Sequence, residues 1–448
     1  MGNYYDKYET MSRSEMEELQ LARLRHMVDY CIEKVPFYKK KLTDAGITSG
    51  DQIKSLKDIS KIPFTTKADI RDNYPDGFLA VPMNEVARIH ASSGTTGKPT
   101  IGYYTKKEME VWADASARVL CLNGLTKDDV MQVSVGYGLF TGAFGFHQGA
   151  EKIGCTIVPA STGNTQKQLV MMHDIGVTVL MATPSYATYL SDLIKQSSIP
   201  AEEFKVKRVL LGAERCTQSM RETIEKNLGV VTADNYGLTE CFGPGVAGEC
   251  DFKCGMHISE DYFYPEIIDP ETGEPLPDGE QGELVFTSLL REGMPLLRYR
   301  TRDITSITHE KCGCGRTTVR MKAPFARTDD MFVFKGVNVF PTQIECAIDS
   351  VPELSPYYHI KLERNESHQD TATVFVELKK ASCLYSEREL LKMREDLEHS
   401  LREIVIVRMN IKLVEPETLQ RFVGKGKRVE DLRYSGEKWF EEWSKCQF

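Results

Sequence analysis

The chain carries, at residues 91–100, the stretch Ala91-Ser92-Ser93-Gly94-Thr95-Thr96-Gly97-Lys98-Pro99-Thr100. Glycines in such a loop let backbone N–H groups converge on an anion, while the hydroxyls add donors and Lys98 adds a point charge. The stretch therefore predicts a loop that grips a polyphosphate. It is not a Walker loop, because Pro99 stands where a hydroxyl would follow the lysine. A solvated Ser/Gly/Thr turn is the alternative that local composition leaves open.

The segments around this loop predict an α/β fold. Residues 86–90 are apolar enough to form a strand that runs into the loop, and strand-like runs alternate with helical runs between residues 154 and 235. That order is typical of parallel βαβ units in a doubly wound sheet. Ligands in such sheets bind beyond the carboxyl ends of strands. Two of these ends carry unusual residues, at 212–214 and 235–240.

The remaining segments predict two further parts. Residues 14–34 show helical periodicity, and residues 263–310 carry hairpin signals that predict a barrel-like antiparallel unit packed on the α/β part. Beyond residues 327–330 we expect an α+β module of about 120 residues. Its elements would be a helix from near Pro341, a strand at 371–378, a helix at 386–402 and a strand at 408–414. The predicted domains are residues 1–328 and 329–448.

Composition narrows the class of partner. The 448 residues are 41% apolar and have a net charge of −9, with no basic block, so neither nucleic acid nor an anionic membrane is an expected partner. No apolar run approaches the roughly 18 residues of a membrane span, and the first residues lack the order of a secretory signal. We expect a cytoplasmic protein that binds small molecules. Its twelve cysteines are too dilute for a disulfide scaffold and should be reduced.

Two other clusters suggest binding sites. Residues 136–146 interleave glycines with aromatic rings, which suits a flat hydrophobic ligand, although tight helix–sheet packing is an equal alternative. The pair Cys250 and His257, together with Cys312-x-Cys314, offers four soft ligands from two turns, as a closed tetrahedral zinc site requires. Cys254 could replace Cys250. Unpaired thiols and a surface histidine are the alternative, because Cys-x-Cys alone is weak evidence.

Taken in order, the motifs resemble those of the adenylate-forming superfamily and, within it, the phenylacetate–CoA ligase family. The resemblance covers nearly the whole chain. It rests on residues 92–99, Tyr236-Gly237-Leu238-Thr239-Glu240, Tyr299-Arg300-Thr301-Arg302-Asp303, Arg327-Thr328-Asp329-Asp330-Met331, the segment 336–345, and Gly424-Lys425-Gly426-Lys427-Arg428-Val429.

The resemblance implies an ATP-dependent ligase that joins an aromatic acid to coenzyme A through an acyl-adenylate and releases AMP and pyrophosphate. Two anions must react, so the site has to neutralise charge and hold the reactants in line. Glu240 would hold Mg2+ through the phosphate oxygens. The loop that would grip the β- and γ-phosphates comprises Ser92, Ser93, Gly94, Thr95, Thr96, Gly97 and Lys98.

Other residues would bind the nucleoside. Tyr236 resembles the residue that stacks on adenine, and Asp303 the carboxylate that accepts both ribose hydroxyls. Family members often carry Thr-Gly-Asp where this chain has Thr301-Arg302-Asp303, so Arg302 replaces the glycine. Arg327 would face the ribose or the phosphates. The remaining nucleotide-binding residues would be Gly212, Ala213, Glu214, Gly237 and Thr239.

The small domain would supply a mobile catalytic residue. Lys425 matches the lysine that stabilises charge at the α-phosphate during adenylation. Asp329 matches a hinge about which this domain rotates, withdrawing Lys425 for the thiol step.

The resemblance also bears on the two other clusters. The wall of the acyl pocket would comprise Tyr137, Phe140, Gly142 and Phe144, and the structural zinc ligands would be Cys250, His257, Cys312 and Cys314. An adenylyltransferase of the coenzyme F390 synthetase type shares these motifs and would leave AMP on its acceptor. A non-catalytic regulator that only binds nucleotide is disfavoured, because Lys425, Asp303 and Glu240 are all present. The chain would act alone or as a homodimer.

Overall fold

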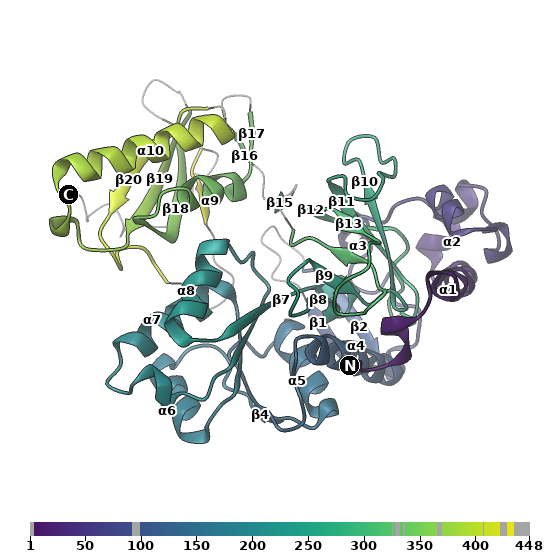
Figure 1. The fold of residues 1–448 in the computed structure, drawn as a ribbon. Coiled ribbons are helices and arrows are strands. Elements are labelled where there is room, and N and C mark those ends of the chain that lie inside the picture. Colours follow the sequence, from purple (N-terminus) through teal and green to yellow (C-terminus); the bar gives the residue numbers. More distant parts are fainter. Residues whose placement is uncertain are drawn as a thin grey trace. The chain divides into compact units, whose positions relative to one another are not determined.

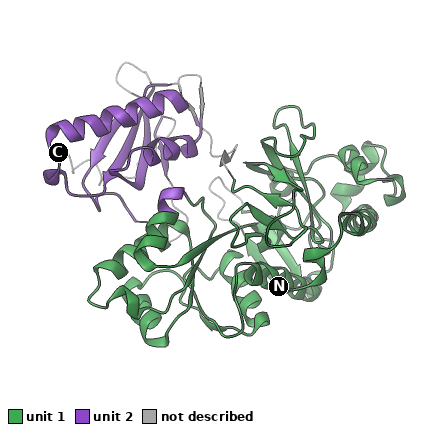
Figure 2. Ribbon diagram, in the orientation of Figure 1, with its two compact units in different colours: residues 1–216, 221–325 green, residues 217–220, 326–448 purple. Residues whose placement is uncertain are grey.

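The computed structural model describes residues 4–91, 99–324, 326–327, 332–334, 337–364, 370–405, 407–421 and 428–433. Figure 2 shows two compact units, one of residues 1–216 and 221–325 and the other of residues 217–220 and 326–448. The main division therefore falls at residue 325, whereas the sequence placed it after Thr328, which lies outside the described residues. The predicted α/β class, with a smaller α+β unit at the C-terminus, is confirmed.

Helices form the N-terminal part of the first unit (Figure 1). The predicted long helix is α1 (Arg13–Lys34), which begins at a capping box in which the Ser12 side chain accepts from the Glu15 backbone N–H. Pro36 opens the next helix, α2 (Pro36–Asp44), because a proline is tolerated at a first helical position. The other elements here are η1 (Lys7–Thr10), η2 (Gly50–Gln52), η3 (Leu56–Lys61), α3 (Lys67–Asp72) and η4 (Met83–Glu85).

A nine-stranded sheet forms the centre of the first unit. Its order is β13-β14-β9-β8-β7-β6-β5-β3-β4. The parallel strands are β3 (Val130–Val133), β4 (Thr156–Val158), β5 (Val179–Ala182), β6 (Arg208–Gly212) and β7 (Val231–Leu238). Antiparallel pairing adds β8 (Gly243–Glu249), β9 (Met256–Ile258), β14 (Arg320–Met321) and β13 (Ile307–Thr308).

Both faces of the parallel strands are buried, as expected for a doubly wound sheet. Leu180 and Val209 pack with side chains of α6 (Thr165–Ile175) and α7 (Pro184–Gln196), and α8 (Gln218–Leu228) lies on the same side. Their neighbours Val179 and Leu210 pack into a separate core with α4 (Lys106–Leu122) and α5 (Gly142–Ile153). Successive residues of a strand face opposite sides of the sheet, so each strand contributes to both cores.

A hairpin brackets the predicted polyphosphate loop. Strands β1 (Val86–Ala91) and β2 (Ile101–Thr105) are antiparallel, and Ala91 pairs with Ile101. Residues 92–98, which carry the predicted phosphate-binding residues, lie outside the described residues.

The sequence left two interpretations of residues 136–146 open, a surface for a flat ligand and tight helix–sheet packing, and helix α5 begins within this segment. Glycine disfavours a helix by about 1 kcal/mol, yet Gly145 and Gly149 occur within α5. A Cβ on Gly149 would lie 2.7 Å from Cβ of Ser116, and one on Gly145 would lie 2.9 Å from Nε1 of Trp112. These glycines therefore allow α5 to approach α4, and packing outweighs propensity.

The predicted barrel-like unit is an antiparallel sheet in which β10 (Phe263–Ile268), β11 (Gly282–Ser288) and β12 (Tyr299–Thr305) pair in that order. Phe263 contacts both Phe242 and Phe286, with ring centroids 5.7 and 5.9 Å apart. This sheet consequently shares one core with the centre of the first unit.

The second unit has its own sheet and core. Strands pair in the order β20-β19-β18-β21, and Ile360, Val374 and Leu397 are buried between this sheet and its helices. Its elements are β15 (Ala326–Arg327), β16 (Phe332–Phe334), β17 (Val337–Val339), α9 (Pro341–Asp349), β18 (Leu354–Arg364), β19 (Asp370–Leu378), η7 (Ser382–Leu384), α10 (Glu387–Val405), β20 (Asn410–Val414) and β21 (Val429–Asp431).

Candidate functional site

The candidate nucleotide site lies where β6 and β7 end. Gly212 pairs with Asn235, so the predicted residues at 212–214 and 235–240 lie side by side, at the end of β6 and along the last part of β7. Ala213 has φ of +67°, a left-handed conformation that a residue with a Cβ rarely adopts. Such strain is concentrated at functional sites. The strand end that the sequence pattern singled out therefore contains a strained residue, Ala213.

Tyr236 and Asp303 are brought together from different sheets. The phenol of Tyr236 on β7 donates to Oδ2 of Asp303 on β12, 2.5 Å away. Asp303 is only 4% exposed, and its backbone N–H donates to the Thr301 hydroxyl at 3.1 Å. The predicted adenine-stacking and ribose-binding residues are therefore direct neighbours.

Arg302 is the residue that departs from the expected Thr-Gly-Asp pattern, and its φ is +69°. The pairing of β11 with β12 shifts register here, which is the signature of a bulge. The backbone N–H of Arg302 donates to the buried Glu283 carboxylate at 3.2 Å. Glu283 thereby helps an arginine hold a conformation that glycine adopts without strain, and Asp303 keeps its place.

Gly237 is required by a close approach of two strands. A Cβ at this position would lie 1.9 Å from the carbonyl oxygen of Gly243 on β8. Any side chain would therefore separate β7 from β8. The next turn, η6 (Thr239–Cys241), carries Thr239, whose hydroxyl lies 3.5 Å from that of Thr141.

Glu240 has the surroundings of a cation ligand. It is 6% exposed, and its Oε1 accepts a hydrogen bond from the Tyr299 hydroxyl at 3.2 Å. Among the described residues, no basic side chain pairs with this carboxylate. Because a buried carboxylate without a counter-charge is costly, a cation fits here. An oxygen ligand suits Mg2+, which prefers carboxylates and phosphates.

Glu214 faces a helix rather than open space. Its Oε2 accepts from the Ser185 hydroxyl at 2.6 Å and from the Ser185 backbone N–H at 3.3 Å. Ser185 lies in the first turn of α7, where a carboxylate is favoured by the helix dipole. This contact ties the strand end at Gly212 to α7.

Two of the rings in the predicted acyl wall are in contact. The rings of Tyr137 and Phe144 are perpendicular with centroids 5.3 Å apart. Burial raises the pKa of Tyr137, whose hydroxyl lies 2.9 Å from Nδ1 of His147. Phe140 is 46% exposed, and Gly142 is the first residue of α5. These four residues lie in one segment, from the end of β3 into α5.

Several predicted residues cannot be placed. The loop residues Ser92–Lys98, the hinge Asp329 and the catalytic Lys425 lie outside the described residues. Arg327 belongs to β15 by its backbone.

The structure gathers the predicted zinc ligands from two distant segments. The ligand atoms of Cys250, His257, Cys312 and Cys314 all lie within 4.8 Å of one another. Sγ of Cys250 is 3.7 Å from Sγ of Cys312, and Sγ of Cys314 is 3.4 Å from Nε2 of His257. Cys254 is exposed and its thiol donates instead to the Phe252 carbonyl at 3.1 Å.

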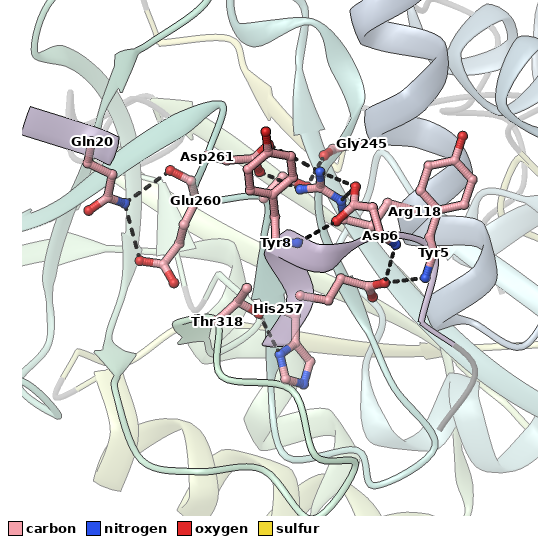
Figure 3. Close-up of polar contacts among 12 residues, drawn as sticks. Tyr5, Asp6, Tyr8, Gln20, Arg118, Gly245, His257, Glu260, Asp261 and Thr318 are labelled. Atoms are coloured by element: carbon pink, nitrogen blue, oxygen red, sulfur yellow. Dashed lines mark hydrogen bonds and ion pairs between the residues drawn. The ribbon is translucent and has the colours of Figure 1, made fainter. Parts of the chain in front are cut away.

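A hydrogen-bond partner orients His257: its Nδ1 lies 3.0 Å from the Thr318 hydroxyl (Figure 3). Nε2 is thereby left for Sγ of Cys314, 3.4 Å away. The N-terminal segment packs beside the same loop, because Tyr4 donates to the Cys314 carbonyl at 3.2 Å and Glu9 pairs with Arg316.

Three polar residues around Glu240 were not predicted. Tyr104 donates to the Thr239 carbonyl at 2.9 Å, Arg291 donates to the Glu240 carbonyl, and Tyr299 reaches the Glu240 side chain. The sequence does carry one signal for Arg291. This residue follows Leu289 and Leu290 in an apolar run, where a charged side chain is a candidate for burial.

The chain is similar to known proteins over nearly its whole length. The AMP-binding enzyme family matches residues 17–289, and the AMP-binding enzyme C-terminal domain matches residues 336–433. A phenylacetate-coenzyme A ligase of Thermus thermophilus is 43% identical over 444 residues, covering 96% of this chain and 99% of its own. One of Aromatoleum evansii is 44% identical and covers 95% of this chain and 96% of its own.

A solved structure is similar throughout. The crystal structure of 2-hydroxyisobutyryl-CoA ligase in the postadenylation state, in complex with R3-HIB-AMP, matches with a TM-score of 0.87 and 27% identity. The match covers 95% of this chain and 91% of that one.

Proposed function

Because the chain belongs to the phenylacetate–coenzyme A ligases among the AMP-binding enzymes, we propose that its acid is phenylacetate or a close arylacetic acid. As a member, it is an ATP-dependent acid–CoA ligase that works through an acyl-adenylate. The substrate rests on one observation, the 43–44% identity with phenylacetate-coenzyme A ligases over nearly the full length. The aromatic segment from Tyr137 to Phe144 supports it, since flat rings favour a flat acid.

In the first half-reaction, a carboxylate oxygen attacks the α-phosphorus of ATP and pyrophosphate leaves with the broken P–O bond. Asp303 binds the ribose hydroxyls and Tyr236 stacks on adenine. Glu240 would hold Mg2+, which supplies charge neutralisation for the phosphates. The loop Ser92–Lys98 grips the β- and γ-phosphates, and Lys425 stabilises charge at the α-phosphate, each as a preorganised group.

In the second half-reaction, the thiol sulfur of coenzyme A attacks the acyl carbonyl carbon. The bond from that carbon to the AMP oxygen breaks, the thiol proton is lost, and AMP leaves. Because one site must serve both steps, the smaller unit rotates about Asp329 and withdraws Lys425 between them.

The cysteine cluster is assigned to structural zinc. With Zn–S bonds of about 2.3 Å, a regular tetrahedron has edges of about 3.8 Å between sulfurs. The 3.7 Å between Cys250 and Cys312 is close to this edge and far longer than a disulfide. The contact between His257 and Thr318 is the outer support that a zinc-bound histidine usually has.

The expected setting is the cytoplasm, with acid, ATP and coenzyme A as the ligands. Across the part of the chain that the structure describes, no helix is both long enough and apolar enough to cross a membrane. The net charge of −9 supports small-molecule partners over nucleic acid. Light scattering would decide between a monomer and a homodimer.

The adenylyltransferase alternative gains nothing from the relatives above, which are named as coenzyme A ligases. The test is pyrophosphate release over a panel of phenylacetate, benzoate, ring-substituted phenylacetates and hexanoate, each with and without coenzyme A. We expect phenylacetate to have the highest kcat/KM and free AMP to appear only when coenzyme A is present. Preference for hexanoate would refute the aromatic pocket. Adenylate remaining on the acceptor after coenzyme A is added would support the transferase.

A further inference from the structure

Arg291 is a buried charge that the reaction scheme leaves unexplained. It is 0% exposed and lies over the rings of Tyr104 and Phe242, with the guanidinium carbon 4.7 and 5.3 Å from the ring centroids. Its acidic neighbour is Glu108 on α4, also buried, with Nε and Oε1 3.9 Å apart. A buried ion pair is weak evidence for stability, because desolvation offsets the attraction. Another role is therefore indicated.

The hydrogen bonds of this cluster converge on one short turn. A guanidinium nitrogen of Arg291 donates to the backbone carbonyl of Glu240. The hydroxyl of Tyr104 donates to the carbonyl of Thr239, the preceding residue, at 2.9 Å. Two consecutive carbonyls of η6 are thus held by side chains from other elements.

The turn has little support of its own. Its N-cap, Leu238, makes no side-chain capping bond, and it ends at Phe242 with φ of +70°. A three-residue turn with a strained end depends on outside contacts to keep one conformation. Since Glu240 is the middle residue, those contacts determine where its carboxylate points.

Glu108 in turn fixes Arg291. Its Oε2 accepts from the Thr105 backbone N–H at 2.8 Å, and its Oε1 accepts from the Glu292 backbone N–H at 3.1 Å. The carboxylate therefore links the start of α4 to the residue next to Arg291. Burial raises the pKa of Glu108, and the charge of Arg291 opposes that rise.

We propose that Arg291 and Tyr104, braced by Glu108, are positioning residues that hold the Thr239–Glu240 turn so that the Glu240 carboxylate meets the metal–nucleotide complex. The inference rests on the proposed role of Glu240 as the Mg2+ ligand. Partners that orient a metal ligand typically contribute roughly 10- to 100-fold to metal affinity.

The test measures Mn2+ binding to the ATP complex of the full chain by electron paramagnetic resonance, which requires no turnover. The variants are Tyr104→Phe, which removes only the hydroxyl, Arg291→Lys and Glu240→Gln. Matched controls are Tyr38→Phe, a buried tyrosine that bonds to Thr65, and Arg118→Met, a buried arginine paired with Asp261. Thermal unfolding is recorded for every variant.

We expect Tyr104→Phe and Arg291→Lys to weaken Mn2+ binding by roughly 10-fold, and Glu240→Gln by at least as much. The Mg2+ concentration for half-maximal pyrophosphate release should rise in parallel, while KM for the acid stays constant. The controls should bind Mn2+ like the parent even if they melt earlier. If Arg291→Lys does not fold, Tyr104→Phe alone decides.

Normal Mn2+ binding in Tyr104→Phe and Arg291→Lys, with Glu240→Gln impaired, would overturn the positioning role and leave the role of Glu240 intact. Normal binding in Glu240→Gln would overturn both. Neither result changes whether the chain releases AMP in making a thioester, which the acid panel measures separately.

Discussion

The phenol of Tyr236 donates a hydrogen bond to Oδ2 of Asp303, 2.5 Å away, and so connects the nine-stranded sheet to the antiparallel sheet beside it. A carboxylate has two oxygens and about four acceptor positions, so Asp303 can keep this bond while it accepts from ribose hydroxyls. The contact fixes two nucleotide-binding side chains relative to one another before ATP arrives.

Asp303→Asn should therefore weaken ATP binding. The amide replaces one acceptor oxygen by a donor and removes the charge, so a ribose hydroxyl loses its acceptor. We expect KM for ATP to rise roughly 10-fold or more, since hydrogen bonds to charged groups contribute about 1.5–3 kcal/mol. KM for the acid should change little. Steady-state kinetics with each substrate varied would check this, with Asp278→Asn, an exposed aspartate paired with His309, as the control. Equal changes in both KM values would contradict the assignment.

Lys425→Ala should impair the two half-reactions unequally. Loss of a preorganised cation at the α-phosphate should slow adenylation by roughly 100-fold or more, and thioester formation from supplied phenylacetyl-adenylate should persist. Lys427→Ala, two residues away, is the matched control and should retain both steps. Single-turnover measurements of each half-reaction are needed. Equal losses in both steps would argue against a lysine that acts only in adenylation.

Zinc should copurify with the chain at close to one atom per molecule. Thiolate sites of this kind stabilise small zinc modules by about 10–16 kcal/mol, so chelation should lower the melting temperature. ATP binding measured by calorimetry should remain, because the cluster is assigned a structural role. Elemental analysis of Cys312→Ser/Cys314→Ser should show no zinc, whereas Cys254→Ser should match the parent. Parent protein without zinc would mean that the four residues are unliganded.

Asp234 should make stability depend on pH. Burial raises its pKa from 3.8 to about 7; the charge of Arg221 opposes that rise and Glu249 adds to it. The folded state then binds the proton more tightly than the unfolded state. This contribution to the free energy of unfolding is present below pH 3.8 and is lost as pH rises towards 7.

In the parent protein, the contribution of Asp234 to the free energy of unfolding should fall by at most about 1.4 kcal/mol per pH unit between pH 3.8 and pH 7. Asp234→Asn cannot titrate and should lose this component of the slope. Urea unfolding at several pH values would measure it, with the exposed Asp51→Asn as a control for charge. A parent-like slope in Asp234→Asn would place the titration elsewhere.

Much of the fold could be predicted because the chain alternates strands and helices with a strong pattern. The strand and helix runs between residues 154 and 235 correspond to β4 through β7, since buried parallel strands read as short apolar runs. Strand β18 was not predicted, because Pro356 interrupts its pattern. The pairing with β19 shifts register there, which accommodates the proline.

Site residues that belong to a recognisable motif could be predicted, whereas contacts between residues far apart in the sequence were harder to predict. Tyr236 and Asp303 followed from the motifs, and the cysteine spacing gave the cluster that the structure assembles. The support of Glu240 by Arg291 and Tyr104 could not be predicted, because it depends on how a loop after β11 packs against β2 and η6.

The acyl-adenylate is the central claim, and oxygen transfer tests it most directly. Phenylacetate labelled with 18O at both carboxyl oxygens is incubated with ATP and coenzyme A, and the products are weighed by mass spectrometry. Attack of the carboxylate on the α-phosphorus places one labelled oxygen on that phosphorus, and cleavage of the acyl carbon–oxygen bond leaves it there. We predict that each AMP released carries one 18O and that the thioester keeps the other. Unlabelled AMP, or ADP in place of AMP, would contradict the account.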